Sequence, residues 1–273
     1  MTKAATPLGL IAAAGSVPLT VAEQVRASGR DLVVITLKSI TDADFSAFSP
    51  IEHRLGAVSA IMASLKDNGV VEVVMAGRFK RPKMAAVMPD MRGAKILSKA
   101  LTMGDDQALH IVKEEFAQDG LRVIDIASIL PQDYAKTGVM TGQEPDQDAM
   151  AAIALGAAYL AASSPFDVGQ SCVVEGQRII VVEAAEGTDA MLARAAGLHD
   201  ADLAPLVMVK MLKKGQDRAL DPPGIGVDTI KGAAKAGVSV IAVESGGVMI
   251  VAPEDTLKTA EHYGITLYGL MPA

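Results

Sequence analysis

The chain of 273 residues contains no tryptophan, a single cysteine, and aromatic residues at only 3% of its positions. With one cysteine, Cys172, no intrachain disulfide can form, which excludes a secreted disulfide scaffold. The run SCVV around Cys172 predicts a small buried strand residue in preference to a catalytic thiol. Because half of the residues are hydrophobic and so few are aromatic, the core must be built from aliphatic side chains.

The chain also has few histidines and no net positive charge. The four histidines lie far apart and form neither HxH nor HExxH, so a histidine-rich zinc site is not expected. The formal net charge is -7 and the pI is near 5.1. A field of this sign repels nucleic acids, so a nucleic-acid partner is not expected and any anionic ligand needs a local group of cations.

Long apolar runs are missing too. The run at residues 8–14 is too short for a membrane span or a signal peptide. The alanine-rich run that begins at Ala149 is interrupted by Gly156 and Tyr159 and is shorter than a spanning helix. We therefore expect a soluble, cytoplasmic protein.

Short apolar segments alternate with amphipathic ones along the first half of the chain. Segments 8–14, 31–37, 70–77 and 121–129 have the composition of buried strands, whereas 17–27, 56–69 and 105–120 have helical periodicity. This alternation predicts a doubly wound, mainly parallel sheet. Asp105 and Asp106, at the start of the third helix, are expected to cap its free amides rather than to bind a metal.

A polar segment rich in proline and glycine, residues 131–148, marks the domain boundary. Beyond it we expect helices at 146–163, from Thr188, and at 228–237, with strands at 170–176, 178–186, 206–212, 238–245, 247–253 and 265–270. The predicted fold class is α/β with two domains and a site in the cleft between them. Residues 1–133 form a Rossmann-like domain with a mainly parallel sheet, 134–148 a linker, and 149–273 a catalytic mixed α/β domain.

The segment from Val207 to Ile230 concentrates charge of both signs next to a stiff loop. Lysines and an arginine precede Asp221, which is followed directly by two prolines. The proline pair restricts the backbone and presents the Asp221 carboxylate rigidly. Cations beside a fixed carboxylate suit chemistry on a phosphate, although a surface loop of no function stays an alternative.

Two segments of the first half could contact an anion. Gly15 follows the first strand where nucleotide-binding folds place phosphate amides, but the pattern has one glycine where the dinucleotide motif has three. Arg78 and Arg81 lie in a basic segment just after a strand, at the sheet edge where open α/β folds bind ligands. They could hold a diphosphate in bidentate fashion, and a solvated basic loop is an equal alternative.

A third segment, residues 181–197, ends a strand in Glu183 and Glu186, turns at Gly187 and begins a helix at Thr188. The helix N-terminus is a potential anion site, and the acidic side chains could hold Mg²⁺. Thr188 and Asp189 are also ordinary capping residues. Two glutamates at the end of an apolar strand are costly to bury without a partner, which favours a functional role.

The motifs GLIAxxGxxP, AGxxxRP, GDDxxL, DVGQxxVVxxGxxxxVEAxEGTDAM and VKxxKxGQDRxxDxPxIG together resemble the LpxI-type UDP-2,3-diacylglucosamine diphosphatases. The resemblance runs from about Leu8 to Leu270 and is more specific in its second half. It implies a two-domain enzyme of lipid A biosynthesis that uses Mg²⁺ and hydrolyses UDP-2,3-diacylglucosamine to 2,3-diacylglucosamine 1-phosphate (lipid X) and UMP. It further implies attack on the sugar-side phosphorus and work at the cytoplasmic face of the inner membrane, peripherally.

In the family the aspartate of DxPxIG is essential, and here it falls on Asp221. Two departures concern the first loop, where Ala13 and Ala14 replace expected glycines, and Pro222, which replaces a leucine. The residues and the resemblance together predict catalytic roles for Asp221, Lys213, Asp217 and Arg218, substrate binding by Gly15, Arg78, Arg81, Gly187, Thr188, Asp189, Lys210 and Gln216, and metal binding by Asp221 and Glu186.

Asp221 would bind the metal or orient the attacking water, while Lys210, Lys213 and Arg218 would stabilise charge on the phosphoryl oxygens. Two other functions stay open: a nucleotide-dependent oxidoreductase, suggested by the first βαβ pattern, and a noncatalytic two-lobed protein that binds an anion. The oxidoreductase would lack both the three-glycine turn and an acidic residue at the end of the second strand. The oligomeric state is open as well, a homodimer being one alternative.

Overall fold

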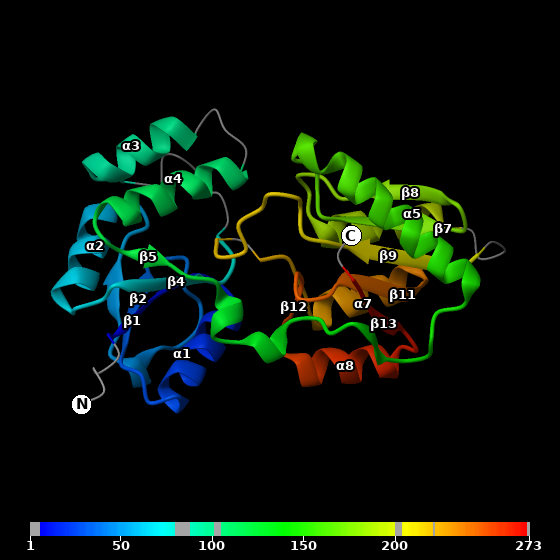
Figure 1. Ribbon diagram of the computed structural model, residues 1–273, viewed down its shortest axis with the longest axis horizontal. Coiled ribbons are helices and arrows are strands. Elements are labelled where there is room, and N and C mark those ends of the chain that lie inside the picture. The colour runs from blue at the N-terminus through cyan, green and yellow to red at the C-terminus, as the bar shows by residue number, and fades with distance from the viewer. Residues whose placement is uncertain (1–5, 80–87, 101–104, 200–203, 221, 272–273) are drawn as a thin grey trace. The chain divides into compact units, whose positions relative to one another are not determined.

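The computed structural model describes residues 6–79, 88–100, 105–199, 204–220 and 222–271 (Figure 1). The chain divides into two compact units. The N-terminal unit comprises Met1–Pro131 and Asp217–Asp221, and the C-terminal unit comprises Gln132–Gln216 and Pro222–Ala273. The predicted α/β class is confirmed, with a parallel sheet in the first unit and a mixed sheet in the second.

The N-terminal unit contains five parallel strands in the order β3-β2-β1-β4-β5. This is the order of the first five strands in doubly wound nucleotide-binding sheets. All five residues of the central strand β1 are buried, as expected for a parallel strand covered on both faces. The strands are β1 (Leu8–Ala12), β2 (Leu32–Leu37), β3 (Ile51–His53), β4 (Glu72–Ala76) and β5 (Arg122–Val123).

Helices α1 (Val17–Ala27), α2 (Val58–Asp67) and α4 (Asp105–Gln118) pack against this sheet, whereas α3 (Met91–Ala100) packs on α2 and α4 (Figure 1). Helix α3 lies partly within the segment that the sequence reading treated as a basic loop. Asp90 explains its start, because one carboxylate oxygen accepts a hydrogen bond from the Gly93 amide at 2.8 Å and the other from the Ser59 amide in α2 at 2.7 Å. One aspartate therefore satisfies free amides of two helices.

Residues 217–220 belong to the N-terminal unit although they lie far from it in the sequence. Ala219 and Leu220 are buried in the same apolar cluster as Phe116 of α4 and Ile35 of β2. Burial of these two side chains fixes the returning segment to the N-terminal unit. Nothing in the hydrophobic pattern predicts this return.

The C-terminal unit contains a six-stranded sheet in the order β6-β13-β11-β9-β7-β8 and a two-stranded sheet of β10 and β12. Strands β9, β11 and β13 are parallel, whereas β7 is antiparallel to β8 and β9, and β6 is antiparallel to β13. Strand β6 lies inside the segment predicted as a linker. The strands are β6 (Gly138–Thr141), β7 (Ser171–Glu175), β8 (Arg178–Val182), β9 (Leu206–Lys210), β10 (Gly224–Ile225), β11 (Val238–Glu244), β12 (Met249–Ile250) and β13 (Thr266–Leu270).

The helices of this unit cover the two faces of the sheet unequally. Helices α6 (Thr188–Leu198), α7 (Val227–Ala236) and α8 (Pro253–His262) share one apolar cluster with Met208 of β9. Helix α5 (Gln147–Ser163) shares the other cluster with Val207 and Val209. The alternation along β9 therefore directs even-numbered positions toward α6 and α7, and odd-numbered positions toward α5.

Helix α5 is continuous through Gly156, a residue expected to interrupt the alanine-rich run that begins at Ala149. A Cβ atom at Gly156 would lie 2.6 Å from a Val209 methyl and 3.2 Å from the Cys172 sulfur. The glycine thus permits close packing of α5 on β7 and β9. Among the described residues one helical segment, Gln147–Phe166, is long and apolar enough to cross a membrane by length and composition alone, with 28% of it buried. One face of this segment packs against β7 and β9.

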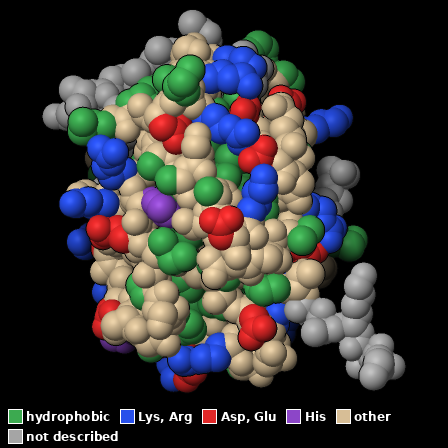
Figure 2. Space-filling view, turned by 90° about the vertical axis from the view of Figure 1, so that its left-hand side faces the viewer, with side chains coloured by type: hydrophobic (Ala, Val, Ile, Leu, Met, Phe, Trp, Pro, Cys, Tyr) green, Lys and Arg blue, Asp and Glu red, His purple; other side chains and the backbone are tan. Residues whose placement is uncertain are grey.

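The face drawn in Figure 2 shows lysine and arginine side chains interspersed with aspartate and glutamate. Hydrophobic side chains lie between them, and the charges of the two signs alternate across the face. A continuous basic surface of the kind that binds a nucleic-acid backbone is not visible on the described part of this face.

Candidate active site

One edge of the C-terminal sheet collects most of the predicted groups of that unit. Strands β8 and β9 both pair antiparallel with β7, so they end at the edge where β7 begins. Lys210, the last residue of β9, lies opposite Ser171 at the start of β7. Glu183 directly follows β8, and its amide donates to the Ser171 carbonyl at 2.9 Å. The topology therefore brings a cation and a carboxylate together.

Lys210 is buried, with only 4% of its surface exposed. Its position in β9 directs the side chain toward α6, where Nζ donates a hydrogen bond to Thr188 Oγ1 at 2.8 Å. The same Nζ lies 3.6 Å from Glu183 Oε2. Lys210 thus joins the end of the sheet to the first residue of a helix.

Glu183 accepts three hydrogen bonds in addition to its ion pair. Thr188 Oγ1 donates to Oε1 at 2.8 Å, while the Gln170 amide at 3.3 Å and the Ser171 hydroxyl donate to Oε2. Burial by itself would raise the pKa of Glu183, but the charge of Lys210 and these hydrogen bonds outweigh burial and leave the pKa below its ordinary value. The carboxylate is therefore ionised at neutral pH.

Helix α6 begins beside this pair. Its N-cap, Gly187, has φ 83° and ψ 172°, a combination open essentially to glycine alone. A Cβ atom at Gly187 would meet nothing within 4 Å, so the helix N-terminus is open on that side. Asp189 lies exposed in the first turn of α6. The amides and dipole of such a helix start attract anions.

Lys213 and Gln216 are linked to Glu183 and Lys210 by hydrogen bonds that involve Gln170. The Gln170 side chain donates to Gln216 Oε1 at 2.7 Å, and the Lys213 amide donates to the same oxygen at 3.3 Å. Lys213 Nζ forms an ion pair with the more exposed Asp167. We define the edge cluster as Gln170, Glu183, Thr188, Lys210, Lys213 and Gln216. The structure thus unites four predicted residues of the C-terminal unit: Thr188, Lys210, Lys213 and Gln216.

Asp217 and Arg218, predicted as catalytic, have their partners in the N-terminal unit. Asp217 forms an ion pair with Lys113 of α4, and Arg218 Nε lies 3.2 Å from Asp125 Oδ2. Burial by itself would raise the pKa of Asp217, but the hydrogen bond and charge of Lys113 and the Ala219 amide outweigh it, so the pKa is lowered. Within the described residues these contacts anchor the returning segment.

Gly15 and Arg78, the described site predictions from the first half of the chain, lie together where β1 and β4 are neighbours. The Arg78 amide donates to the Ala14 carbonyl at 2.8 Å, which fixes the loop of Gly15 against the end of β4. Gly15 has φ 98°, and its amide donates to Asp42 Oδ1 at 2.8 Å. A carboxylate therefore already occupies the amide that was predicted to bind an anion.

Asp221 and Arg81 lie outside the described residues, so the structure does not place them. The residues that follow Asp221 are fixed. Pro223 accepts a hydrogen bond from the Met249 amide at 2.8 Å, and β10 pairs with β12. The chain immediately after Asp221 is therefore held to β12 in the two-stranded sheet by backbone hydrogen bonds.

The predicted metal ligands have only partial support. Glu186 accepts a hydrogen bond from Arg194 of α6, an ion pair that a metal would have to replace. Glu183 is engaged by Lys210 and three donors. In the described part of the chain no group of three or more His, Cys, Asp and Glu side chains is arranged to hold a metal ion. The described residues alone do not fit a protein-only Mg²⁺ site.

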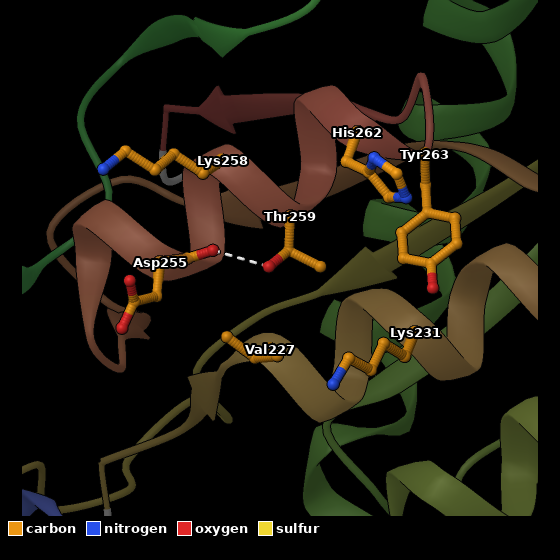
Figure 3. Close-up of a pocket in the computed structure, with 7 residues that line it drawn as sticks. All are labelled: Val227, Lys231, Asp255, Lys258, Thr259, His262 and Tyr263. Atoms are coloured by element: carbon orange, nitrogen blue, oxygen red, sulfur yellow. Dashed lines mark hydrogen bonds between the residues drawn. The ribbon is translucent and has the colours of Figure 1, made fainter.

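A surface pocket lies elsewhere, between α7 and α8 (Figure 3). Its volume is about 430 Å³, and Figure 3 shows the Thr259 hydroxyl donating to the Asp255 carbonyl. None of the predicted site residues lines it. The lining residues are Val227, Lys231, Asp255, Lys258, Thr259, His262 and Tyr263.

Cys172 is buried in β7 against α5, as predicted from its setting. Burial raises the pKa of the thiol to about 12, so the reactive thiolate does not form at neutral pH.

The sequence reading missed groups that hold the predicted residues in place. Glu183 was noted as costly to bury without a partner, and that partner is Lys210. Gln170 and Asp167 precede β7, and only the strand pairing shows that they meet the end of β9. Asp42 gives no signal, because its contact with Gly15 depends on how the loop after β2 folds back.

Comparison with known proteins covers nearly the whole chain. The LpxI N-terminal domain family matches residues 7–132, and the LpxI C-terminal domain family matches residues 136–268. A similar relative is the protein named UDP-2,3-diacylglucosamine pyrophosphatase LpxI of Caulobacter vibrioides. It is 33% identical over 273 aligned positions, which cover 97% of this chain and 98% of the relative.

Proposed function

The chain belongs to the LpxI family, and on that basis we propose that it hydrolyses UDP-2,3-diacylglucosamine in lipid A biosynthesis. The products would be 2,3-diacylglucosamine 1-phosphate and UMP. The observation that carries the proposal is Lys210, a buried cation fixed beside the open N-terminus of α6. A lysine and helix amides directed at one edge of a sheet are suited to the negative charge of a diphosphate.

The edge cluster would act by position and charge. Glu183 and Thr188 hold the Lys210 ammonium in one place, so little reorganisation is needed when charge develops on the phosphoryl oxygens. The Lys213 side chain is 12% exposed and that of its partner Asp167 is 41% exposed, so a phosphate oxygen could take the place of the Asp167 carboxylate. Gln216 fixes the turn that carries Lys213 by accepting from the Lys213 amide.

Mg²⁺ remains part of the proposal, resting on Asp221 and on the substrate's own diphosphate. Magnesium is commonly held by one or two carboxylates together with substrate phosphates. When bound, it would neutralise charge on the bridging and terminal phosphate oxygens. The residues that follow Asp221 are held by the hydrogen bond from the Met249 amide to Pro223 and by the pairing of β10 with β12. The place of action would be the cytoplasmic face of the inner membrane, peripherally, because the substrate carries acyl chains.

The proposal is tested by incubating the purified protein with UDP-2,3-diacylglucosamine in detergent micelles, with Mg²⁺ or with a chelator. We expect UMP and the diacylglucosamine 1-phosphate by mass spectrometry, and loss of both with chelator. In water enriched in ¹⁸O, the label should enter the sugar phosphate if attack occurs at the sugar-side phosphorus. Intact substrate after prolonged incubation with Mg²⁺ would contradict the assigned reaction, and label in UMP would contradict the assigned point of attack.

A further inference from the structure

Helix α5 has an outer face that is apolar from Ala149 to its C-terminal end. No Lys, Arg, Asp or Glu lies at residues 149–166, in a chain where 21% of residues are charged. Met150 and Leu155 of α5 are 38% and 36% exposed, and Phe166, in the 3-10 turn Ser164–Phe166 that follows α5, is 78% exposed. Between them are further exposed alanines at helical spacings of three and four: Ala151, Ala154, Ala158, Ala161 and Ala162. An apolar face of this extent on a charged protein indicates a contact surface.

The exposed residues are arranged symmetrically about Ala158. Positions eight residues to either side are Met150 and Phe166, and positions four residues to either side are Ala154 and Ala162. Leu155 and Ala161 lie three residues to either side. In an antiparallel contact between two identical copies about a twofold axis at Ala158, each residue meets its counterpart on the other side, so Met150 would face Phe166 and Ala154 would face Ala162. We propose that α5 packs antiparallel against α5 of a second copy of this chain, with Ala158 at the axis.

The small residues near the centre of α5 would let the two helix axes approach closely. The larger side chains, Met150 and Phe166, would meet at both ends of the contact. This pairing buries the parts of α5 that the sheet of its own unit leaves exposed.

The charges at the two ends of α5 favour a second copy over a lipid surface. Exposed Glu144, Asp146 and Asp148 stand at the N-terminal end. At the C-terminal end, Lys213 pairs with exposed Asp167, and the amide of exposed Lys214 donates to Ser164 Oγ at 2.6 Å, so two lysines and one aspartate lie there. Antiparallel pairing places the three acids of one copy near Lys214 of the other. The same three acids oppose docking of the α5 face on an anionic lipid surface.

The expected strength follows from the length of α5. Seventeen residues span about 25 Å at 1.5 Å per residue. One helix pair of this length buries an area near the lower limit for stable complexes. We therefore expect a dimer that dissociates on dilution, with Kd on the order of micromolar.

The proposal is tested on the full chain by sedimentation velocity between about 1 and 100 µM, a range that brackets the expected Kd. Wild type should shift from monomer to dimer. Ala158→Glu places two carboxylates against each other at the axis and should weaken the dimer by more than about 100-fold. Ala63→Glu is the matched control, because Ala63 is an exposed alanine in the middle of α2; this variant should dimerise like wild type.

A second variant identifies the contact directly. Ala158→Cys should form a disulfide-linked dimer on mild oxidation, whereas wild type should not, since its Cys172 is buried. Wild type that stays monomeric at the highest concentration would overturn the proposal, as would an Ala158→Glu protein that dimerises normally. Flotation of wild type with phosphatidylcholine vesicles, lost in Ala158→Glu, would make a bilayer the occupant and also overturn it.

Discussion

Replacing Glu183 by glutamine tests what holds Lys210 at the edge of the C-terminal sheet. The substitution keeps the shape of the side chain but leaves the buried ammonium of Lys210 without its carboxylate. Removing one partner of a buried ion pair costs about 3–5 kcal/mol. Glutamine retains one oxygen that can accept from Thr188 or Ser171, so we expect a loss of about 3 kcal/mol in the free energy of unfolding.

All four tyrosines, Tyr134, Tyr159, Tyr263 and Tyr268, lie in the C-terminal unit, and the chain has no tryptophan. Tyrosine fluorescence in urea therefore reports the unfolding of that unit alone. With a slope of about 2 kcal/mol per molar urea, the midpoint should fall by about 1.5 M. The double variant Glu183→Gln with Lys210→Met removes both charges and should recover most of this loss.

The pH dependence of the same measurement gives an independent check. The folded pKa of Glu183 is lowered from its ordinary value of 4.5. The stabilisation is therefore present above about pH 4.5 and is lost as the pH falls through the folded pKa. The gap between wild type and Glu183→Gln should be full at pH 7 and shrink below pH 4.5. A gap under about 0.5 kcal/mol at pH 7, or one that widens in acid, would refute the ion-pair reasoning.

Two further substitutions and one chemical test follow from the site. Gly187→Ala forces a Cβ atom into a backbone conformation that only glycine adopts readily, so we expect the free energy of unfolding in urea to fall by about 1–3 kcal/mol. Gly197→Ala, in open space in the same helix, should raise it by about 0.5–1 kcal/mol. Equal effects of the two substitutions would contradict the role of Gly187. Cys172 should resist iodoacetamide at pH 8 in the folded protein and react after unfolding, because burial raises the pKa of its thiol to about 12. Mass spectrometry measures the alkylation. Rapid alkylation of the native protein would show that the thiol is accessible.

The parts of the fold that follow from local pattern were predictable. Helix α1 begins at Val17 with Pro18 in its first turn, and α6 begins at Thr188, both as the sequence indicates. Strand β3 has only three residues, too few to show a period. Helix α8 was not predicted. Segment 247–253 was expected to be a strand that ends at Pro253, whereas Pro253 is the first residue of the helix. Helix α3 was not predicted; it begins in the basic segment that follows β4.

The candidate site was predictable to the extent that it depends on strand ends. Lys210 and Glu183 each end an apolar run, and parallel strands bring such ends to one edge. The sequence could not show that the charged segment from Val207 to Ile230 is divided between the two units. Lys213 and Gln216 bond within the C-terminal unit, whereas Asp217 pairs with Lys113, more than a hundred residues earlier. Contacts of such sequence separation leave no local periodic signal.

The most direct test of the central claim is the rate of UMP release from UDP-2,3-diacylglucosamine by the double variant Lys210→Met with Glu183→Gln. This variant removes the buried cation together with its counter-charge, so its unfolding midpoint should stay near that of wild type. We expect kcat/KM to fall by about 100- to 1,000-fold, the effect of removing one preorganised group that stabilises developing charge. A folded double variant that releases UMP within about twofold of the wild-type rate would contradict the assignment of the edge cluster as the active site.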